Sequence, residues 1–359
     1  MKTILHLTNT LTIGGTEILL KNTIPLLPQY NHVICYLHGE PTMKIDFKGV
    51  PIYCLEHNGK SNLFRSVLRL RRILKANKID ILHSHLFWSG IIARLAKIKG
   101  VKLAYTLHNV LSFDAFQKNK YSLIAERATI KKVDALIGVS SFVLEDYMKH
   151  VRYKGATHLL YNFIPSIFFD ESSETEKPNE PIELRCVAVG TLNYQKNYEY
   201  LLSAFSKLKG LPVSLDIFGD GPKREPIQKT IDEEKLHVRL KGISNSMERV
   251  LPGYDIFLQA SHYEGYGIAL VEGMAKGLLP LISNIPVHKE VAGESAFYFD
   301  LESSDSLAEL LKELIEEPSI INRNRQGVMQ RAKLVGSPIS YKEKLEYIYN
   351  SMVKEDSVP

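Results

Sequence analysis

Cysteine is scarce in this chain of 359 residues, and long apolar runs are absent. The three cysteines, Cys35, Cys54 and Cys186, are odd in number and far apart, which argues against a disulfide framework and against a zinc site. We expect three buried thiols in a protein of the reducing cytoplasm. No stretch of eighteen apolar residues occurs, so no segment is expected to span a bilayer. The N-terminus is too polar for a signal peptide and predicts a strand.

Internal repeats and low-complexity runs are also absent, and the length predicts two domains. The content of 45% apolar and 24% charged residues is ordinary for a globular protein. The net charge of +5 hides an asymmetry. Residues 1–170 carry 23 Lys and Arg against 11 Asp and Glu, an excess of twelve positive charges, whereas residues 171–359 carry 22 against 29. The first half is therefore expected to meet an anionic partner: nucleic acid, an anionic membrane or a phosphorylated acceptor.

The most informative stretch runs from Ser261 to Gly277 (SHYEGYGIALVEGMAKG). An apolar run before it predicts a buried strand, and the helical spacing of apolar residues after Gly267 predicts a helix that Gly277 ends. The glycines thus lie where a strand turns into a helix, and the free N–H groups of a helix start favour a phosphate. Glu264 and Glu272 would repel a phosphate, so we expect them to accept hydrogen bonds from sugar hydroxyls. A buried turn with solvated glutamates is the alternative.

The two glutamates resemble the Glu-x7-Glu signature of retaining glycosyltransferases with the GT-B fold, in particular glycosyltransferase family 4, also called group 1. The resemblance implies that Glu272 binds the ribose hydroxyls of a nucleotide and that Glu264 lies beside the donor sugar. It also implies that the loop of Gly265, Tyr266 and Gly267 holds the donor diphosphate through its amides. Phenylalanine is commoner in the family at the position of Tyr266.

Two glycines follow the first expected strand, in the run Gly14-Gly15-Thr16. A helical pattern comes after them, and Thr16 is expected as its N-cap. This turn resembles the N-terminal glycine loop of the family. The resemblance implies that Gly15 contacts the donor, and that Gly14 and Thr16 lie on the acceptor side. A plain turn between strand and helix is the alternative.

Histidines end two further expected strands, at His85 and at His108. Ligands bind outside the carboxyl ends of strands in open α/β sheets, so these side chains are expected to reach a ligand. The histidine spacing matches no zinc motif, and we expect no metal site. His108, in the run Thr-Leu-His-Asn, matches the family's histidine near the reacting donor sugar, which implies a catalytic role. For His85 we expect a place on the acceptor side or a structural role that orients the turn.

Residues 62–78 predict a helix with apolar side chains on one side and basic side chains over the remainder. Its basic part includes Arg65, Arg69 and Arg72. A solvated face is the ordinary interpretation, and attachment to an anionic membrane surface is the sharper one. Binding of nucleic acid would need interleaved aromatic residues. Phe64 alone is present there, so no nucleic-acid partner is expected.

The loop from Thr191 to Asn197 follows another expected strand. In family 4 an arginine and a lysine of this loop clamp the donor diphosphate. Lys196 keeps the lysine position, which implies a catalytic role, whereas Thr191 stands where the arginine is usual. Two further positions resemble donor-binding positions of the family: Asp220 in the turn Gly-Asp-Gly-Pro, and Ile243, where the backbone reads the base.

Strands and helices alternate in both halves, which predicts two α/β domains with parallel sheets. We expect an N-terminal acceptor-side domain over residues 1–165, an acidic, proline-bearing linker over 166–183, and a nucleotide-sugar-binding domain over 184–339. The resemblance implies the GT-B fold, with two facing Rossmann-like domains and a cleft between them. It also implies that a last helix, over 340–355, packs back onto the first domain.

The resemblance implies a retaining transferase that moves a hexose or N-acetylhexosamine from a nucleotide sugar to a hydroxyl of a glycan or lipid-linked acceptor, in bacterial-type surface polysaccharide synthesis. A UDP-sugar is the first expectation and a GDP-sugar the next. No cofactor besides the donor substrate is expected. No Asp-x-Asp triplet, the usual metal anchor of the other large glycosyltransferase fold, occurs in the sequence. The alternatives are a GT-B nucleotide-sugar epimerase and a non-catalytic nucleotide-sugar-binding protein. The expected location is the cytoplasm, with peripheral attachment to the inner face of the membrane.

Overall fold

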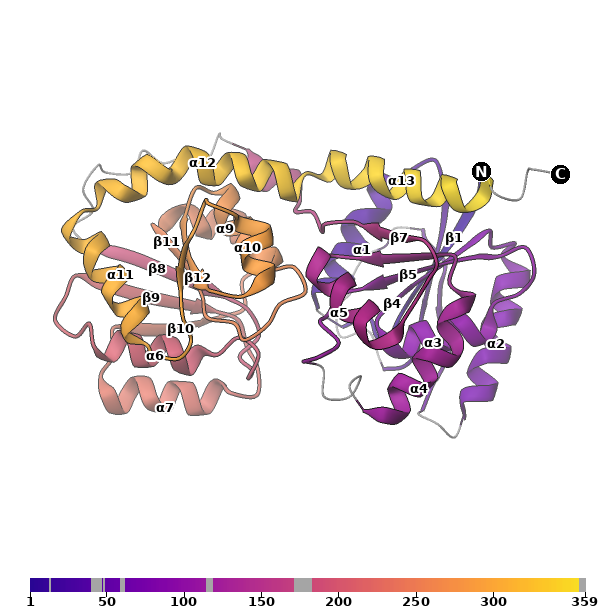
Figure 1. Ribbon diagram of the computed structural model, residues 1–359, viewed down its shortest axis with the longest axis horizontal. Coiled ribbons are helices and arrows are strands. Elements are labelled where there is room, and N and C mark those ends of the chain that lie inside the picture. The colour runs from indigo at the N-terminus through magenta and orange to yellow at the C-terminus, as the bar shows by residue number, and fades with distance from the viewer. Residues whose placement is uncertain are drawn as a thin grey trace. The chain divides into compact units, whose positions relative to one another are not determined.

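The computed structural model describes residues 1–12, 14–39, 47, 49–58, 62–113, 119–170 and 183–354. The chain divides into two compact units: unit 1 comprises Met1–Asn162 with Pro338–Pro359, and unit 2 comprises Phe163–Ser337. Each unit is built around a parallel sheet (Figure 1). The prediction of two α/β domains with parallel sheets is therefore confirmed. Among the described helices, none combines the length and apolarity that crossing a bilayer requires.

The strands of unit 1 form a parallel sheet in the order β3-β2-β1-β4-β5-β6-β7. The elements in chain order are β1 (Thr3–Thr8), α1 (Gly15–Leu26), β2 (Asn31–Tyr36), β3 (Ile52–Cys54), α2 (Leu63–Ala76), β4 (Ile81–His85), α3 (Phe87–Ala96), β5 (Lys102–Leu107), α4 (Lys120–Thr129), η2 (Ile130–Lys132), β6 (Ala135–Gly138), α5 (Ser141–Val151), β7 (Thr157–Leu159) and α13 (Pro338–Lys354). The central strands are buried along most of their length, as in parallel sheets that are covered on both faces. The strand order reverses between β1 and β4, and ligands of open α/β sheets bind at the carboxyl ends of such a strand pair.

The strands of unit 2 repeat this order, as β10-β9-β8-β11-β12-β13. The elements are η3 (Ser166–Phe169), β8 (Leu184–Val189), α6 (Tyr198–Ser206), β9 (Val213–Phe218), α7 (Arg224–Glu234), β10 (Val238–Gly242), α8 (Met247–Val250), η5 (Leu251–Gly253), β11 (Ile256–Gln259), α9 (Ile268–Ala275), β12 (Leu279–Ser283), α10 (Pro286–Ala292), β13 (Phe297–Phe299), α11 (Asp305–Glu316) and α12 (Ser319–Gly336). Here the order reverses between β8 and β11. The loops that follow these two strands are therefore the first place to look for a ligand site in unit 2.

Most expected elements are present, with one correction at a helix start. Thr16 is not an N-cap, because α1 begins at Gly15 and Gly14 takes the cap position with an extended backbone. Gly277 follows α9 as expected, with a φ of +72° that favours glycine.

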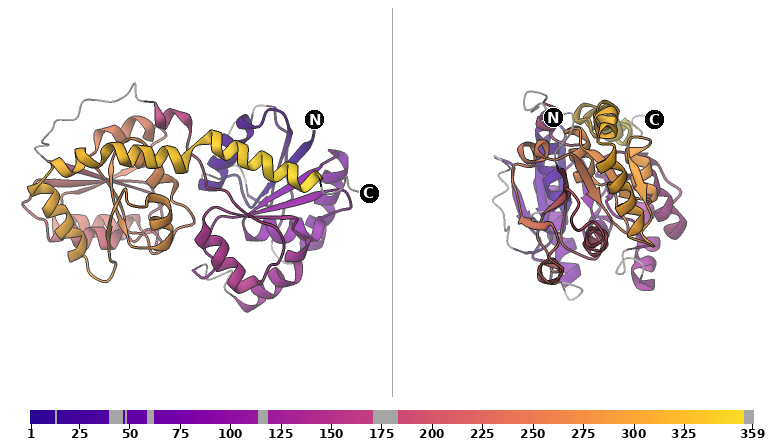
Figure 2. Two further views of the ribbon diagram at one scale, coloured as in Figure 1. Left: turned by 45° about the horizontal axis from the view of Figure 1, so that its top comes forward. Right: turned by 90° about the vertical axis from the view of Figure 1, so that its left-hand side faces the viewer.

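The last helix of the chain, expected over residues 340–355, is α13, and its contacts assign it to unit 1, where it packs beside α1 (Figure 2). Tyr341, Leu345 and Tyr349 are buried there. Residues 171–182 of the expected linker lie outside the described residues, and η3 precedes them. Cys35 and Cys186 are buried as expected, whereas Cys54 is only half-buried, because β3 is the edge strand of its sheet.

Candidate active site

Two loops of unit 2, one after β8 and one after β11, are joined by hydrogen bonds. His262 N–H donates to the Gln195 carbonyl at 2.9 Å, and Gln195 Nε2 donates to the Tyr263 carbonyl at 3.0 Å. Tyr194 stacks on His262 with ring centroids 4.6 Å apart. The two loops lie at the point where the strand order reverses. Residues 68 positions apart in the sequence are thus brought into direct contact.

Lys196 and Glu264 form a shielded ion pair between these loops. Lys196 Nζ lies 2.7 Å from Glu264 Oε1, and the side chains expose only 16% and 7% of their surface. Ser261 Oγ and Gln259 Nε2 donate to the same oxygen, at 2.6 and 2.8 Å. Burial acts to raise the pKa of Glu264, but the charge and hydrogen bond of Lys196, with the Ser261 hydroxyl, outweigh it and lower the pKa. Glu264 is therefore an ionised carboxylate at neutral pH.

A buried histidine, His288, acts on this pair through Gln259, which lies between them. Gln259 Nε2 also lies 3.1 Å from His288 Nε2, and His288 Nδ1 lies 2.8 Å from the Ser283 carbonyl. Because a carbonyl only accepts, Nδ1 carries the proton and Nε2 accepts from the Gln259 amide. Burial lowers the pKa of His288 to about 4, so the ring is neutral. Gln259 is thereby oriented with its amide nitrogen toward Glu264.

Glu272, the second glutamate of the motif, has no such partners. It lies in α9, half-buried, and within the described residues its carboxylate has no hydrogen bond or ion pair. Burial, with a contribution from the carboxylate of Glu248, raises its pKa to about 8. A half-buried carboxylate without donors is suited to accept hydrogen bonds from hydroxyl groups of a ligand.

The loop between the two glutamates leads directly into α9. Gly267 has a φ of +92° and takes the N-cap position. The side chain of Tyr266 is 2% exposed, and its hydroxyl donates to the Val335 carbonyl at 2.7 Å. The Tyr266 side chain is thus occupied in the core, where phenylalanine would lack the hydroxyl bond. Gly265 and Tyr266 can serve a ligand only through their backbone groups.

The loop after β8 packs closely on the turn after β9. A Cβ on Gly219 would lie 1.9 Å from the Gly190 carbonyl oxygen, so this approach requires glycine. Leu192 N–H donates to the carbonyl of Asp220, whose side chain is exposed. Thr191 and Ile243 are exposed as well. None of these three side chains joins the Lys196–Glu264 pair by a hydrogen bond or an ion pair.

In unit 1 the glycine turn lies over a buried acid that sequence reasoning missed. Glu17 is 5% exposed, and Thr8 Oγ1 donates to it at 3.2 Å. Burial raises the pKa of Glu17, against the hydrogen bonds from its own backbone and from Thr8. A Cβ on Gly14 would lie 2.6 Å from Glu17 Oε2, which explains that glycine. Gly15 and Thr16 form the first turn of α1, and Gly15 has open space around it.

The histidines of unit 1 meet on one face of its sheet. His85 Nδ1 lies 3.1 Å from His108 Nε2, so the two histidines predicted from the sequence are in contact. Although part of His108 reaches the surface, burial of its ring lowers its pKa to about 4. Burial also lowers the pKa of His83 to about 3 and holds that of His85 well below its ordinary range. These imidazoles are neutral at pH 7.

Three histidines lie close enough together to be considered as metal ligands, although the sequence spacing predicted no metal site. One ring nitrogen from each of His6, His83 and His85 lies within 4.8 Å of the others. Both nitrogens of His83 are already bonded, to Tyr349 Oη and to Thr106 Oγ1, each at 2.7 Å. Three nitrogens bound to one zinc ion lie about 3.3 Å apart, given zinc–nitrogen distances near 2.0 Å. His83 therefore has no free nitrogen for a metal ion, and the three histidines do not provide three ligands.

Comparisons with known proteins match both halves of the chain. The family described as Glycosyltransferase Family 4 matches residues 13–166, and that described as Glycosyl transferases group 1 matches residues 170–333. A 41.2 kDa protein of the cps region of Klebsiella pneumoniae is 24% identical, over 86% of this chain and 88% of its own length. A 4-alpha-N-acetylgalactosaminyltransferase of Campylobacter jejuni, named for an undecaprenol-diphosphate-linked acceptor, is 23% identical over 78% and 79%. The Anabaena protein HepE, solved with UDP and glucose, superposes with a TM-score of 0.83 at 16% identity, over 98% and 100%.

Proposed function

The chain is a GT-B glycosyltransferase of group 1 that acts in glycan synthesis, and from this premise we propose its reaction. It moves a hexose or N-acetylhexosamine from a nucleotide sugar to a hydroxyl of a glycan or lipid-linked acceptor, with retention of the anomeric configuration. A UDP-sugar is the first choice of donor, supported by the likeness to HepE, which was solved with UDP. A GDP-sugar is the next.

The observation that carries this proposal is the Lys196–Glu264 pair at the carboxyl ends of β8 and β11. Lys196 has three N–H donors, and Glu264 engages one of them, so two remain for a diphosphate. The amides at the start of α9 add fixed donors. Glu272, without donors of its own, accepts hydrogen bonds from the ribose. The site thus offers separate groups to the diphosphate and to the ribose of a nucleotide sugar.

The reaction follows from where charge develops. The bond from the anomeric carbon to the diphosphate oxygen breaks, and its electron pair stays on that oxygen. The acceptor oxygen forms the new bond on the same face, and its proton passes to the leaving diphosphate. Lys196 and the helix-start amides stabilise the growing phosphate charge more in the transition state than in the ground state.

The proposal is tested first by the ligand and then by the product. UDP-, GDP- and ADP-sugars are screened for thermal stabilisation, where a ligand at 100 to 1,000 times its Kd should add about 3–4 kcal/mol. The stabilising donor is then incubated with candidate acceptors, and NMR reads the anomeric configuration of the product. Retained configuration and strict dependence on an acceptor support the proposal. Conversion of the donor sugar without any acceptor indicates an epimerase, and an inverted product rejects the retaining mechanism.

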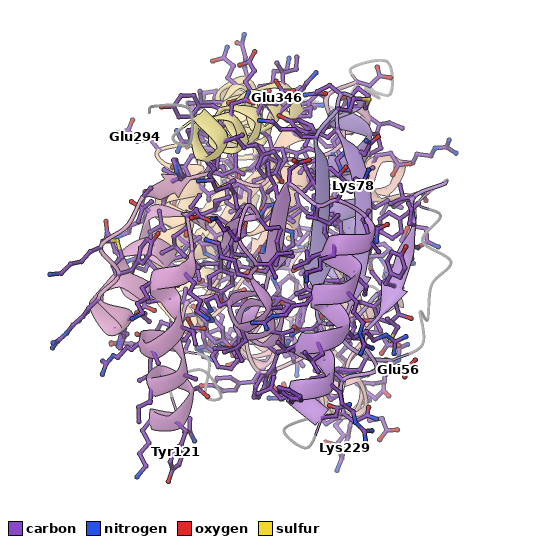
Figure 3. All side chains as sticks on the ribbon, turned by 90° about the vertical axis from the view of Figure 1, so that its right-hand side faces the viewer. Glu56, Lys78, Tyr121, Lys229, Glu294 and Glu346 are labelled. Atoms are coloured by element: carbon purple, nitrogen blue, oxygen red, sulfur yellow. The ribbon has the colours of Figure 1, made fainter. Side chains whose placement is uncertain are left out.

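A lipid-linked acceptor would require the enzyme to reach a membrane, and α2 offers a surface for it. Figure 3 labels Lys78, which follows the end of α2, and Glu56, which lies between β3 and α2. Residues 63–76 contain no acidic side chain, and Phe64 in the first turn is 74% exposed. Arg69 reaches Glu56 at 2.9 Å, but both partners are well exposed and such a pair is weak. The helix thus keeps a basic face beside an apolar tip.

We expect α2 to bind anionic membranes reversibly, at about 1 kcal/mol per basic residue near the surface. Flotation with anionic and neutral vesicles tests this, because the attraction is screened within about 8 Å at physiological salt. Replacement of Arg65, Arg69 and Arg72 by serine should weaken binding to anionic vesicles, and high salt should weaken it further. The control replaces Lys207, Lys209 and Lys229 of unit 2, with the same loss of charge. Equal, negligible binding to both vesicle types would favour a soluble acceptor.

A further inference from the structure

Hydrogen bonds join the histidines of unit 1 into two short runs. In the first run, His32 Nε2 lies 3.0 Å from the Leu27 carbonyl oxygen, and His32 Nδ1 lies 3.1 Å from His6 Nε2. In the second run, His85 Nδ1 lies 3.1 Å from His108 Nε2. His6 and His85 come from neighbouring parallel strands, β1 and β4, and their rings stack at 6.3 Å and 20°. The two runs therefore end next to each other.

The protons of the first run follow from the carbonyl at its end. The Leu27 oxygen only accepts, so His32 carries its proton on Nε2. Burial lowers the pKa of His32, and burial with neighbouring histidines lowers that of His6, so both rings are neutral near pH 7. His32 Nδ1 is then an acceptor, and His6 donates to it from Nε2. His6 Nδ1 is consequently a bare lone pair on a side chain that is only 1% exposed.

Two buried nitrogens at the facing ends of the runs lack a hydrogen-bond partner that a water molecule could supply. His6 Nδ1 and His85 Nε2 are buried and have no hydrogen-bond partner within the described part of the chain. A water that bridges two nitrogens, with bonds of about 2.8–3.0 Å, holds them about 4.5–5 Å apart. One ring nitrogen from each of His6, His83 and His85 lies within 4.8 Å of the others, so the rings are close enough for such a bridge. Buried polar nitrogens without a protein partner are the groups that an ordered water satisfies.

We propose that His85 is a positioning residue for His108, and that one buried water links it to His6. His85 donates from Nε2 to the water, and the water donates to His6 Nδ1. His108 donates from Nε2 to His85 Nδ1. All N–H groups then point the same way along the chain, so each hydrogen bond polarises the next.

This arrangement fixes which nitrogen of His108 faces a ligand. The proton stays on Nε2, and Nδ1 presents a lone pair that accepts a hydrogen bond from a sugar hydroxyl. The substrate contact of His108 rests on the proposed function, whereas the hydrogen-bond chain does not. A shift of the His108 proton from Nε2 to Nδ1 would remove this acceptor without moving the ring.

The chain is tested on the resting protein by two-bond proton–nitrogen NMR of labelled histidine, which distinguishes the two neutral tautomers. His6, His32, His85 and His108 should all carry the proton on Nε2. A proton on Nδ1 of His6 or of His108 overturns the inference. Replacement of His6 by glutamine keeps a polar group toward His32 and removes the acceptor at Nδ1. It should shift the nitrogen resonances of His85 and His108, and unchanged resonances contradict the link.

Two substitutions of His85 test its effect on transfer. The amide of asparagine stands near the place of Nδ1, and that of glutamine near the place of Nε2. H85N can still accept from His108, so it should restore most of the kcat that H85Q loses, at nearly equal KM. We expect at least a tenfold difference in kcat between them. Equal kcat in two folded variants overturns the positioning role, whereas full activity in H108A rejects the proposed role of His108 and leaves the NMR result standing.

Discussion

Replacement of Lys196 by alanine separates the structural contribution of this lysine from its catalytic one. The substitution leaves the buried carboxylate of Glu264 without its cation. Removal of one partner of a buried ion pair destabilises a protein by about 3–5 kcal/mol. Gln259 and Ser261 still donate to Glu264, so we expect the lower end of that range, about 3 kcal/mol. Urea unfolding at pH 7, monitored by circular dichroism, measures the difference.

The double variant K196A/E264Q tests whether the loss of stability comes from the unpaired charge of Glu264. Glutamine is neutral and keeps an oxygen that accepts from Gln259 and Ser261, so the double variant should recover about 2 kcal/mol. Transfer should not recover, because the departing diphosphate still lacks its cation, and both variants should lose about a hundredfold in kcat. Lys207→Ala is the matched control. Its partner Asp305 lies 2.6 Å away, but this pair is on the surface, so the unfolding midpoint should hardly change.

Two results would refute this reasoning. Unfolding of K196A within about 0.5 kcal/mol of the wild type would show that Glu264 is not held by its cation, since that is the range of neutral surface substitutions. Wild-type turnover in K196A/E264Q would show that Lys196 serves only to hold Glu264. In that case the diphosphate is stabilised by other groups.

Three further predictions follow from the site. Glu272→Gln should weaken nucleotide binding by about 1.5–3 kcal/mol in calorimetry at pH 9, where the carboxyl group is ionised. Wild-type affinity should rise from pH 7 to 9, because this carboxyl group has a pKa of about 8. A flat pH profile contradicts the ribose contact. Transfer should persist in excess EDTA, because Lys196 and helix-start amides replace a cation, and a loss restored by magnesium or manganese rejects this mechanism. Acid should destabilise the fold, because burial lowers the pKa values of His83 and His288 to about 3 and 4 and the unfolded chain therefore takes up protons first below pH 6.5. The free energy of unfolding in urea should fall by about 2 kcal/mol per buried histidine between pH 7 and 5. Equal stability at the two pH values would show that these rings titrate in the folded protein as they do in the unfolded chain.

Local sequence patterns predicted the parts of the site that lie within one loop. The run from Glu264 to Glu272 gave both glutamates and the turn into α9, because glycine placement and helical spacing are local signals. The place of Lys196 followed from the resemblance of its loop to that of family 4. Its ion pair with Glu264 could not be predicted from spacing, since it depends on β11 lying beside β8. The strand order, and not the sequence interval, brings these side chains together.

The supporting polar residues were missed because each is a single polar residue within an apolar run. Gln259 closes the strand Ile256–Gln259, and His6 interrupts Thr3–Thr8. A single polar residue of this kind does not change the prediction of a strand. A buried polar group nevertheless requires a hydrogen-bond partner. Glu17 gives no such signal, because an acid in the first turn of a helix is ordinary. An isolated polar residue in a buried strand is the signal that could have found Gln259 and His6.

The polar clusters of the two units lie at equivalent places in two sheets of the same order. Lys196 and Glu264 follow β8 and β11, whereas His6 and His85 belong to β1 and β4. At each place the strand order reverses, so the following helices diverge to opposite faces and leave the carboxyl ends uncovered. Polar groups can be buried there only when their partners are fixed, because an unpaired polar atom is destabilising. The same hydrogen bonds that satisfy burial also fix the direction of each side chain, and a site that holds a reacting sugar needs this fixed direction.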